Sequence, residues 1–144
     1  LKQCHDHLDA VPRAQVVYNR ERTRGLTIEL ADAIGEAWVK DASVQLRDVG
    51  KGARLCVKAE TKALERTAEG GYVLRNGPFL RRFLDGYYPM RVSVDVEMPV
   101  DLLRFASVSP APQDGFKVWQ DAQGVHIDSW FEGRLVTELH FLPN

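Results

Sequence analysis

The sequence has 144 residues, of which 44% are apolar and 27% charged, and its 19 basic and 20 acidic side chains give a formal net charge of −1. This composition is typical of a globular protein, and the length indicates a single domain over residues 1–144. The balanced charge argues against a general polyanion binder, so we expect no nucleic-acid partner. No apolar run approaches the roughly 20 residues that span a bilayer, so we expect no transmembrane segment.

The first half of the chain predicts one helix, two hairpins and a segment between them that could be helical. Apolar residues recur at helical spacing before Pro12, which predicts a short helix over residues 1–11. Alternating residues on both sides of a charged link predict a hairpin over 14–30. Residues 29–42 are ambiguous: an alanine-rich apolar stripe fits a helix, but Gly35 in its middle counts against one. A glycine-containing turn between two alternating segments predicts a second hairpin over 44–59.

The middle of the chain predicts a helix followed by the longest strand. Pro78 follows Asn76 and Gly77, a sequence typical of a helix start, and an apolar stripe continues this helix over residues 78–87. Residues 90–98 then alternate strictly between apolar and polar side chains and are bracketed by prolines. This period of two predicts a strand with one buried and one wet face, which is typical of an antiparallel sheet.

The last third predicts a three-stranded meander over residues 116–141. Apolar residues alternate in three segments separated by short turns. A slip of one residue would expose a strand's apolar set, so the pattern selects a register that pairs Val118 with Ile127 and Ile127 with Leu139.

This register places polar and aromatic residues together on the other face of the meander. Side chains that lie opposite one another on neighbouring strands are close enough to interact. Trp119, His126 and His140 would form one row, with Asp128, Glu138 and Trp130 in the adjoining rows. Histidine and carboxylate side chains suit a metal or proton transfer, and tryptophan suits contact with a ligand. A solvated polar face explains the same residues, so these six are candidates for ligand binding, and we predict no metal and no cofactor.

Two other groups of residues are candidates for binding an ion, one for a metal and one for an anion. His5 and Asp9, with Cys4 and His7 on a neighbouring face, have the spacing of metal ligands on a helix, although a second ligand cluster is missing. Arginines gather near residues 13–24 and 75–91, where they suit an anion, but acidic residues dilute both groups.

Two cysteines, Cys4 and Cys56, indicate the compartment. An even pair favours a disulfide and an oxidising environment, and the sequence does not begin with methionine. We therefore expect a disulfide-bonded protein that is periplasmic or secreted. On the predicted strand register Cys56 points away from Leu55 and Val57, which weakens the argument for the bond.

These observations predict a mainly β fold, with α+β as the alternative: an antiparallel sandwich or open half-barrel with two or three short helices and a C-terminal meander. No reaction motif is present, so we expect a non-catalytic extracytoplasmic domain that binds a partner protein or a small molecule. The alternative is a small metal-dependent or acid–base enzyme that uses His126, His140, Asp128 and Glu138. A third interpretation is a structural subunit whose sheet edge joins another chain, including a homodimer.

Overall fold

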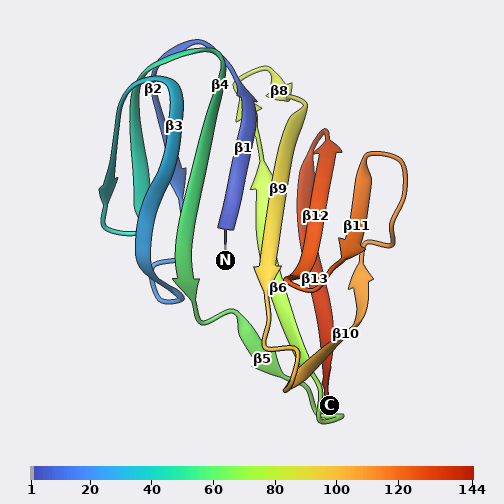
Figure 1. Cartoon of the computed structure of the whole chain (residues 1–144). Helices are drawn as coiled ribbons and strands as arrows, with labels where there is room; N and C mark the ends of the chain where they lie inside the picture. Colours follow the sequence, from blue (N-terminus) through green and yellow to red (C-terminus); the bar gives the residue numbers. More distant parts are fainter. Residues whose placement is uncertain (1) are drawn as a thin grey trace.

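The computed structural model describes residues 2–144, apart from the side chain of Phe83, and these residues form strands without a helix (Figure 1). The prediction of a mainly β, antiparallel fold is confirmed, and the predicted short helices are wrong. Within the described part of the chain no helix is long and apolar enough to cross a membrane. The strands are β1 (Lys2–Leu8), β2 (Val11–Val17), β3 (Thr23–Lys40), β4 (Ser43–Thr61), β5 (Leu64–Arg66), β6 (Tyr72–Leu80), β7 (Arg82–Phe83), β8 (Gly86–Tyr87), β9 (Met90–Glu97), β10 (Leu103–Ser109), β11 (Phe116–Gln120), β12 (Gly124–Phe131) and β13 (Arg134–Pro143).

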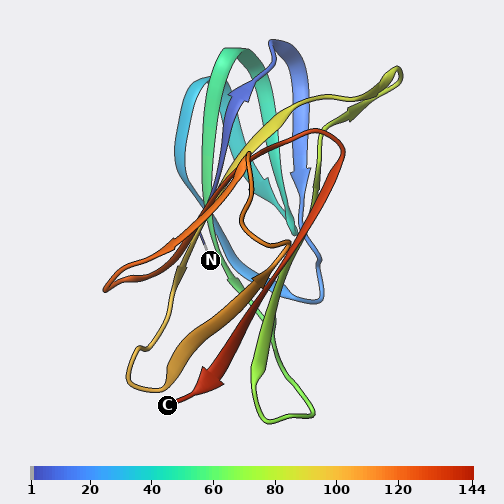
Figure 2. The same ribbon diagram turned by 90° about the vertical axis from the view of Figure 1, so that its right-hand side faces the viewer.

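Two antiparallel sheets carry the fold. The large sheet has the order β11-β12-β9-β1-β4, and β2 and β3 also pair with β4. The small sheet has the order β10-β13-β6-β5. Strands β7 and β8 form a separate hairpin, which Figure 2 shows projecting from the body of the molecule.

Residues 2–61, which form β1 to β4 of the large sheet, fold over on themselves. Strand β4 pairs along one edge with β2 and then with β1, while β3 follows its other edge. Figure 1 shows these strands turning over together and returning as a second layer. Left-handed backbone lies at this turn, with φ values of 56° at Ala33, 52° at Asp48 and 76° at Gly52. Such residues interrupt the pleat and let a long strand bend.

The protein has two hydrophobic cores, one inside the folded-over part of the large sheet and one between the large and small sheets. The folded-over core lies within residues 8–57 and is built on Val44, Leu46, Val49, Ala53, Leu55 and Val57 of β4. The sandwich core lies between the two sheets and includes Leu74, Phe79, Val92, Val94, Val96, Phe116, Val125, Ile127, Leu139 and Phe141. Burying each such aliphatic side chain stabilises the fold by roughly 1.5–3 kcal/mol.

Strand β1 joins the two cores. Its edges pair with β4 and β9, so His5 lies between Leu55 of the folded-over core and Val92 of the sandwich core. Gln3 and His5 are both buried, with exposed fractions of 5% and 4%. These polar side chains therefore mark the boundary between the cores.

The central strand prediction is confirmed. Strand β9 covers most of the predicted range 90–98, with Val92, Val94 and Val96 buried in the sandwich core. Ser93 and Asp95 lie on the opposite, partly exposed face. Strict alternation identified both the element and its buried face because only one face of this sheet packs against the second sheet.

The predicted helix over 1–11 is wrong, since these residues form β1 and the start of β2. Leu1 lies outside the described residues. Strand β1 is central in its sheet, and Gln3, Cys4 and His5 are all buried, so both faces of the strand are covered. A strand covered on both faces does not show the period of two, which left the coincidental helical spacing as the stronger signal.

The helix that was one interpretation of residues 29–42 does not form, because this segment up to Lys40 belongs to β3. Its pairing with β4 shifts register in three places: between residues 24 and 27, 28 and 30, and 32 and 34. The first two shifts each add one unpaired residue to β3 and change the phase of its alternation, and the third leaves four residues of β4 opposite one residue of β3. The apolar residues of β3 therefore recur at three- and four-residue intervals, as they would on a helix.

The predicted helix over 78–87 is replaced by the end of β6 and the β7–β8 hairpin. Phe79 packs into the sandwich core, whereas Leu84 at the hairpin tip is fully exposed. The chain reverses next to Gly86, whose φ of 131° suits a turn rather than the end of a helix. The apolar stripe therefore does not form a single buried face.

Both hairpins predicted in the first half are wrong in their pairing. Strands β2 and β3 do not pair with each other as predicted over 14–30, because each pairs with a different edge of β4. The glycine-containing turn predicted near residues 48–52 is a bend within β4. Glycines suit a bend within a long strand as well as a turn between two strands, so the sequence did not separate these outcomes.

The C-terminal meander is confirmed in its first half. Strands β11 and β12 pair in the predicted register, with Val118 opposite Ile127 and Trp119 opposite His126. Strand β13 does not continue the meander, because it crosses to the small sheet and pairs with β6 and β10. Ile127 and Leu139 are both in the sandwich core but on opposing sheets. Alternation shows which face of a strand is buried, but not which sheet contains the strand.

Candidate functional site

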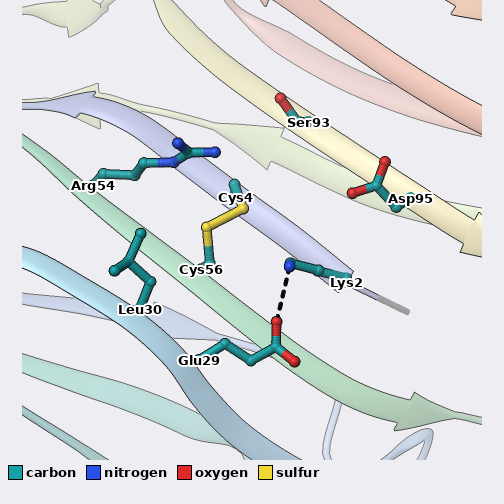
Figure 3. A pocket seen from close by; sticks show the side chains of 8 residues that line it. All are labelled: Lys2, Cys4, Glu29, Leu30, Arg54, Cys56, Ser93 and Asp95. Atoms are coloured by element: carbon teal, nitrogen blue, oxygen red, sulfur yellow. Dashed lines mark ion pairs between the residues drawn. A yellow bond between two sulfur atoms is a disulfide. The ribbon is translucent and has the colours of Figure 1, made fainter.

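A disulfide joins Cys4 and Cys56, as the cysteine count predicts. The two residues lie directly opposite each other on β1 and β4, with their Cα atoms 4.1 Å apart. The bond lies on the outer face of the large sheet, away from the cores, and lines a cavity of about 560 Å³ (Figure 3). On the same face Lys2 forms an ion pair with Glu29 at 3.1 Å.

A polar row crosses the outer face of the large sheet beside the disulfide. The register places Trp119, His126, Asp95, Lys2 and Lys58 opposite one another on β11, β12, β9, β1 and β4. Side chains in such a row are near neighbours, so five strands contribute to one surface.

His126 is the most constrained side chain of this row. Its Nδ1 lies 2.7 Å from Oδ1 of Asp95, and its Nε2 lies 3.1 Å from Oδ2 of Asp121. The ring of Trp119 stacks on the imidazole with centroids 5.4 Å apart and an interplanar angle of 18°. The hydrogen bond with Asp95 is the main cause that raises the pKa of His126, and Asp121 adds to it against the effect of burial.

Asp121 is itself fixed by the turn between β11 and β12. Its Oδ1 accepts hydrogen bonds from the backbone N–H groups of Gln123 at 2.7 Å and Gly124 at 3.2 Å. The Gln123 hydrogen bond is the main cause that lowers the pKa of Asp121, and the contact with His126 lowers it further. Two ordered carboxylates therefore favour the imidazolium form of His126 and hold its ring in place.

Asp128 and Trp130 lie on the same outer face, away from His126. The guanidinium of Arg91 donates two hydrogen bonds to Asp128, at 3.0 Å and 2.9 Å, and this pairing lowers the pKa of Asp128. Trp130 is 52% exposed and contacts the ring of His7 edge-on at a centroid distance of 6.0 Å. Trp130 is therefore exposed on this face, whereas both carboxylate oxygens of Asp128 are paired with Arg91.

His140 and Glu138 are not part of this surface. Both lie on β13 in the small sheet, where Arg75 pairs with Glu138 at 2.6 Å and His140 lies 3.8 Å from the same carboxylate. The predicted row of Trp119, His126 and His140 is therefore wrong in its third member. Among residues 2–144, no group of three or more histidine, cysteine or acidic side chains is arranged to hold a metal ion.

The N-terminal cluster is dispersed between the two faces of β1. Cys4 is bonded to Cys56, His5 points into the interior, and Asp6 pairs with Arg54 at 2.8 Å on the outer face. Neighbouring side chains of a strand point to opposite faces. The spacing that would bring these residues together on a helix therefore does not bring them together on β1.

The two arginine groups do not form one anion site. Several of these arginines pair with carboxylates from distant segments: Arg20 with Asp41, Arg22 with Glu65, Arg75 with Glu138, Arg81 with Asp9, and Arg91 with Asp128. Such pairing neutralises much of the positive charge that an anion would need.

A second cavity, which sequence reasoning missed, lies where β1 begins. It has a volume of about 720 Å³, and we name it the β4–β9 cavity after the two strands that border it. Its lining includes apolar residues of both sheets, with the 46% exposed Leu64 at its mouth and Leu74, Val96, Met98, Leu103 and Phe141 further in. Its rim carries charged and polar residues of the large sheet: Lys2, Glu29, Lys58, Glu60, Asp95, Glu97 and His126.

The sequence contains no local signal for the β4–β9 cavity. Its lining comes from the ends of strands that are far apart along the chain, and it depends on which strands are neighbours. The incorrect placement of β13 and β4 therefore concealed it. Only Asp95 and His126, on two correctly predicted strands, could have pointed to this part of the surface.

Comparisons with known proteins identify no relative. No protein-family model matches the sequence. Neither the curated proteins nor the solved structures gave a significant match. The case for function consequently depends on the geometry of this chain.

Proposed function

We propose that this chain is a non-catalytic binding domain whose ligand enters the β4–β9 cavity. The observation that carries the proposal is a cavity of about 720 Å³ that joins apolar residues of both sheets to a charged rim. Ligand sites in proteins are commonly concave spaces of about 300–1,000 Å³ with an apolar lining and a few well-placed polar groups. Such a site suits a ligand with an apolar part and a polar part.

The rim supports this proposal because its polar groups are ordered. His126 is held between Asp95 and Asp121 and stacked on Trp119, so its position is fixed before a ligand arrives. Pre-ordered side chains lose little conformational entropy on binding, which favours affinity. Trp119 is 49% exposed and extends the rim with an aromatic surface.

The same contacts favour binding over acid–base catalysis. A general base needs a ring nitrogen within reach of a substrate proton. Both nitrogens of His126 contact carboxylates, and His140 and Glu138 lie on the other sheet. The enzyme alternative therefore lacks the four-residue cluster that suggested it.

The disulfide supports a periplasmic or secreted location. Disulfides persist in oxidising compartments and are rare in reducing ones. Alkylation of free thiols in intact cells, followed by mass measurement of the purified protein, tests this location. We expect no alkylation of Cys4 or Cys56, and alkylation at both would contradict it.

Binding is tested with N-phenyl-1-naphthylamine, a neutral apolar probe that fluoresces in apolar sites. We expect saturable binding that is weakened about tenfold by Leu64→Trp, which fills the mouth of the cavity. Leu84→Trp is the matched control, because Leu84 lies on the projecting hairpin and lines no part of the cavity. Equal binding by both variants, or no saturable binding by the unmodified protein, would contradict the proposal.

The proposed partner is a small molecule or a protein segment, and a second copy of the chain remains a separate prediction. Light scattering over a range of protein concentrations tests self-association. A dimer whose formation is unaffected by Leu64→Trp would place the homodimer contact elsewhere on the surface.

A further inference from the structure

Another cavity lies in the folded-over part of the large sheet, over β2, the first part of β4 and the end of β3. It has a volume of about 330 Å³, and we name it the β2–β4 cavity. Its polar lining consists of Arg13 and Gln15 of β2, Gln45 and Arg47 of β4, and Trp38 of β3. On β4 these residues alternate with Val44 and Leu46 of the folded-over core, so they point to the outer face. None of them lines the β4–β9 cavity, and the two spaces are therefore separate candidates for binding.

The two arginines of the β2–β4 cavity lie directly opposite each other. Arg13 pairs with Arg47 in the antiparallel register of β2 and β4, and both residues are exposed. Like charges at directly opposite positions destabilise a sheet. Glu36 offsets part of this repulsion, because its carboxylate lies 3.6 Å from the guanidinium of Arg47, whereas Arg13 forms no ion pair with any residue that the structure describes. The pair therefore keeps a positive charge that an anion would neutralise.

The next pair of residues on the same face supplies an ordered amide. Gln15 lies opposite Gln45, two residues from the arginine pair on each strand, and residues at this spacing lie about 7 Å apart along a strand. The side-chain nitrogen of Gln45 donates to the side-chain oxygen of Gln15 at 3.2 Å and to the hydroxyl of Ser43 at 2.8 Å. Because the oxygen of Gln15 accepts from Gln45, the amide nitrogen of Gln15 is the atom that can donate to a ligand.

Trp38 adds an aromatic side to the β2–β4 cavity. It lies opposite Gln45 on the other edge of β4 and is 37% exposed. The guanidinium of Arg47 lies over its ring, 5.2 Å from the centroid. A guanidinium stacked on an aromatic ring keeps the N–H groups at its edge for hydrogen bonds. The exposed part of the tryptophan ring offers an apolar surface to an organic group next to the anion.

These donors fit a phosphate group better than a carboxylate. Arginine binds both groups bidentately, but a phosphate monoester has three terminal oxygens that can accept hydrogen bonds, whereas a carboxylate has two. Three side chains, Arg13, Arg47 and Gln15, bring donors to this cavity. The charge of a phosphate monoester, about −1.5 to −2 at neutral pH, also matches two guanidinium groups.

We propose that the β2–β4 cavity is a second ligand site, which binds a phosphate monoester between Arg13 and Arg47. The phosphate replaces the repulsion between the two arginines with attraction to both, and Gln15 donates a further hydrogen bond. The organic group of the ester lies against Trp38. This inference goes beyond the proposed function, since it concerns another site and another class of ligand.

Calorimetry with phenyl phosphate tests this inference. We expect saturable binding that Arg13→Gln weakens at least about tenfold, as expected for the loss of hydrogen bonds to a charged group. Arg24→Gln is the matched control, because Arg24 is an exposed arginine of β3 that does not line the cavity and its replacement changes the net charge equally. Equal binding by the two variants, or no saturable binding by the unmodified protein, would overturn the inference.

Two further ligands test the chemical class. Inorganic phosphate should bind more weakly than phenyl phosphate because it lacks the ring, and Trp38→Leu should remove this difference. Benzoate has the ring but a carboxylate in place of the phosphate, so we expect it to bind at least about fivefold more weakly than phenyl phosphate. Equal affinity for benzoate and phenyl phosphate would show that the site does not select phosphate, which would overturn the inference.

Thermal unfolding separates a binding role of Arg13 from a structural one. Arg13→Gln removes a like-charge contact, so the melting temperature of the free variant should equal or exceed that of the unmodified protein. Phenyl phosphate should raise the melting temperature of the unmodified protein and of Leu64→Trp, but not that of Arg13→Gln. If Arg13→Gln lowers the melting temperature and leaves phenyl phosphate binding intact, the arginine has a structural role only and the inference is wrong.

Discussion

His5 and His126 occupy opposite faces of the large sheet, and their surroundings move their pKa values in opposite directions. His5 lies inside, on β1, where burial lowers its pKa to about 4 in spite of the nearby Asp6. His126 lies outside, on β12, where the hydrogen bond with Asp95 raises its pKa. His5 and His126 therefore affect the free energy of unfolding in different ranges of pH.

Replacing His5 should remove a loss of stability in acid. The unfolded protein binds a proton at His5 near pH 6.5 and the folded protein only near pH 4, so stability falls as the pH drops between these values. Between pH 7 and pH 5 we expect His5 to account for about 2 kcal/mol of lost unfolding free energy. Urea unfolding of the unmodified protein and of His5→Leu at both pH values measures this difference. An identical pH dependence in the two proteins would contradict it.

Replacing His126 should change the pH dependence of stability in the opposite sense, by removing a stabilisation that is present at low pH. Because the folded pKa is raised, its stabilising effect is complete below the unfolded pKa of about 6.5 and is lost as the pH rises through the folded value. We expect a contribution below about 1 kcal/mol, since the carboxylate partners are partly exposed. His126→Gln should flatten the profile of unfolding free energy between pH 6 and pH 9, and an unchanged profile would contradict this prediction.

Removing the disulfide should cost a large part of the protein's stability. The bond between Cys4 and Cys56 spans a sequence separation of 52 residues, and closing such a loop stabilises a protein by about 4 kcal/mol in the chain-entropy treatment. The double variant Cys4→Ala/Cys56→Ala should unfold at lower urea by this amount. A reductant should destabilise the unmodified protein and leave the double variant unchanged.

Two glycines with similar backbone angles should respond differently to alanine. Gly77 has φ of 103°, and an added Cβ would lie 2.6 Å from the carbonyl oxygen of Leu135. Gly70 has φ of 85°, but nothing lies within 4 Å of its added Cβ. Gly70→Ala should cost about 1 kcal/mol for the left-handed backbone, and Gly77→Ala should cost at least about 2 kcal/mol. Equal unfolding free energies would show that β13 does not approach β6 this closely.

The elements that were predictable from sequence are those with one buried face and one wet face. Strand β9 and the β11–β12 pair alternate strictly, and their buried faces and register follow from that pattern. The cysteine count indicated the disulfide, although the expected position of Cys4 on a helix was wrong.

The remaining errors have physical causes of their own. Strand β1 is covered on both faces and β3 is interrupted by bulges, so neither shows a period of two. Strand β13 alternates correctly, but alternation does not specify its partner strand. The candidate site shares this limit: His126 was found because its strand was placed correctly, while the β4–β9 cavity depends on contacts between distant segments.

The most direct measurement of the binding proposal is a titration of the isotope-labelled protein with N-phenyl-1-naphthylamine, followed in amide nitrogen–proton spectra. The proposal predicts that the largest shifts fall at the end of β9 and directly after it, from Asp95 to Met98, and at Leu74 and His126, with none in the β7–β8 hairpin. Shifts confined to other strands, or a spectrum that the probe leaves unchanged, would contradict it.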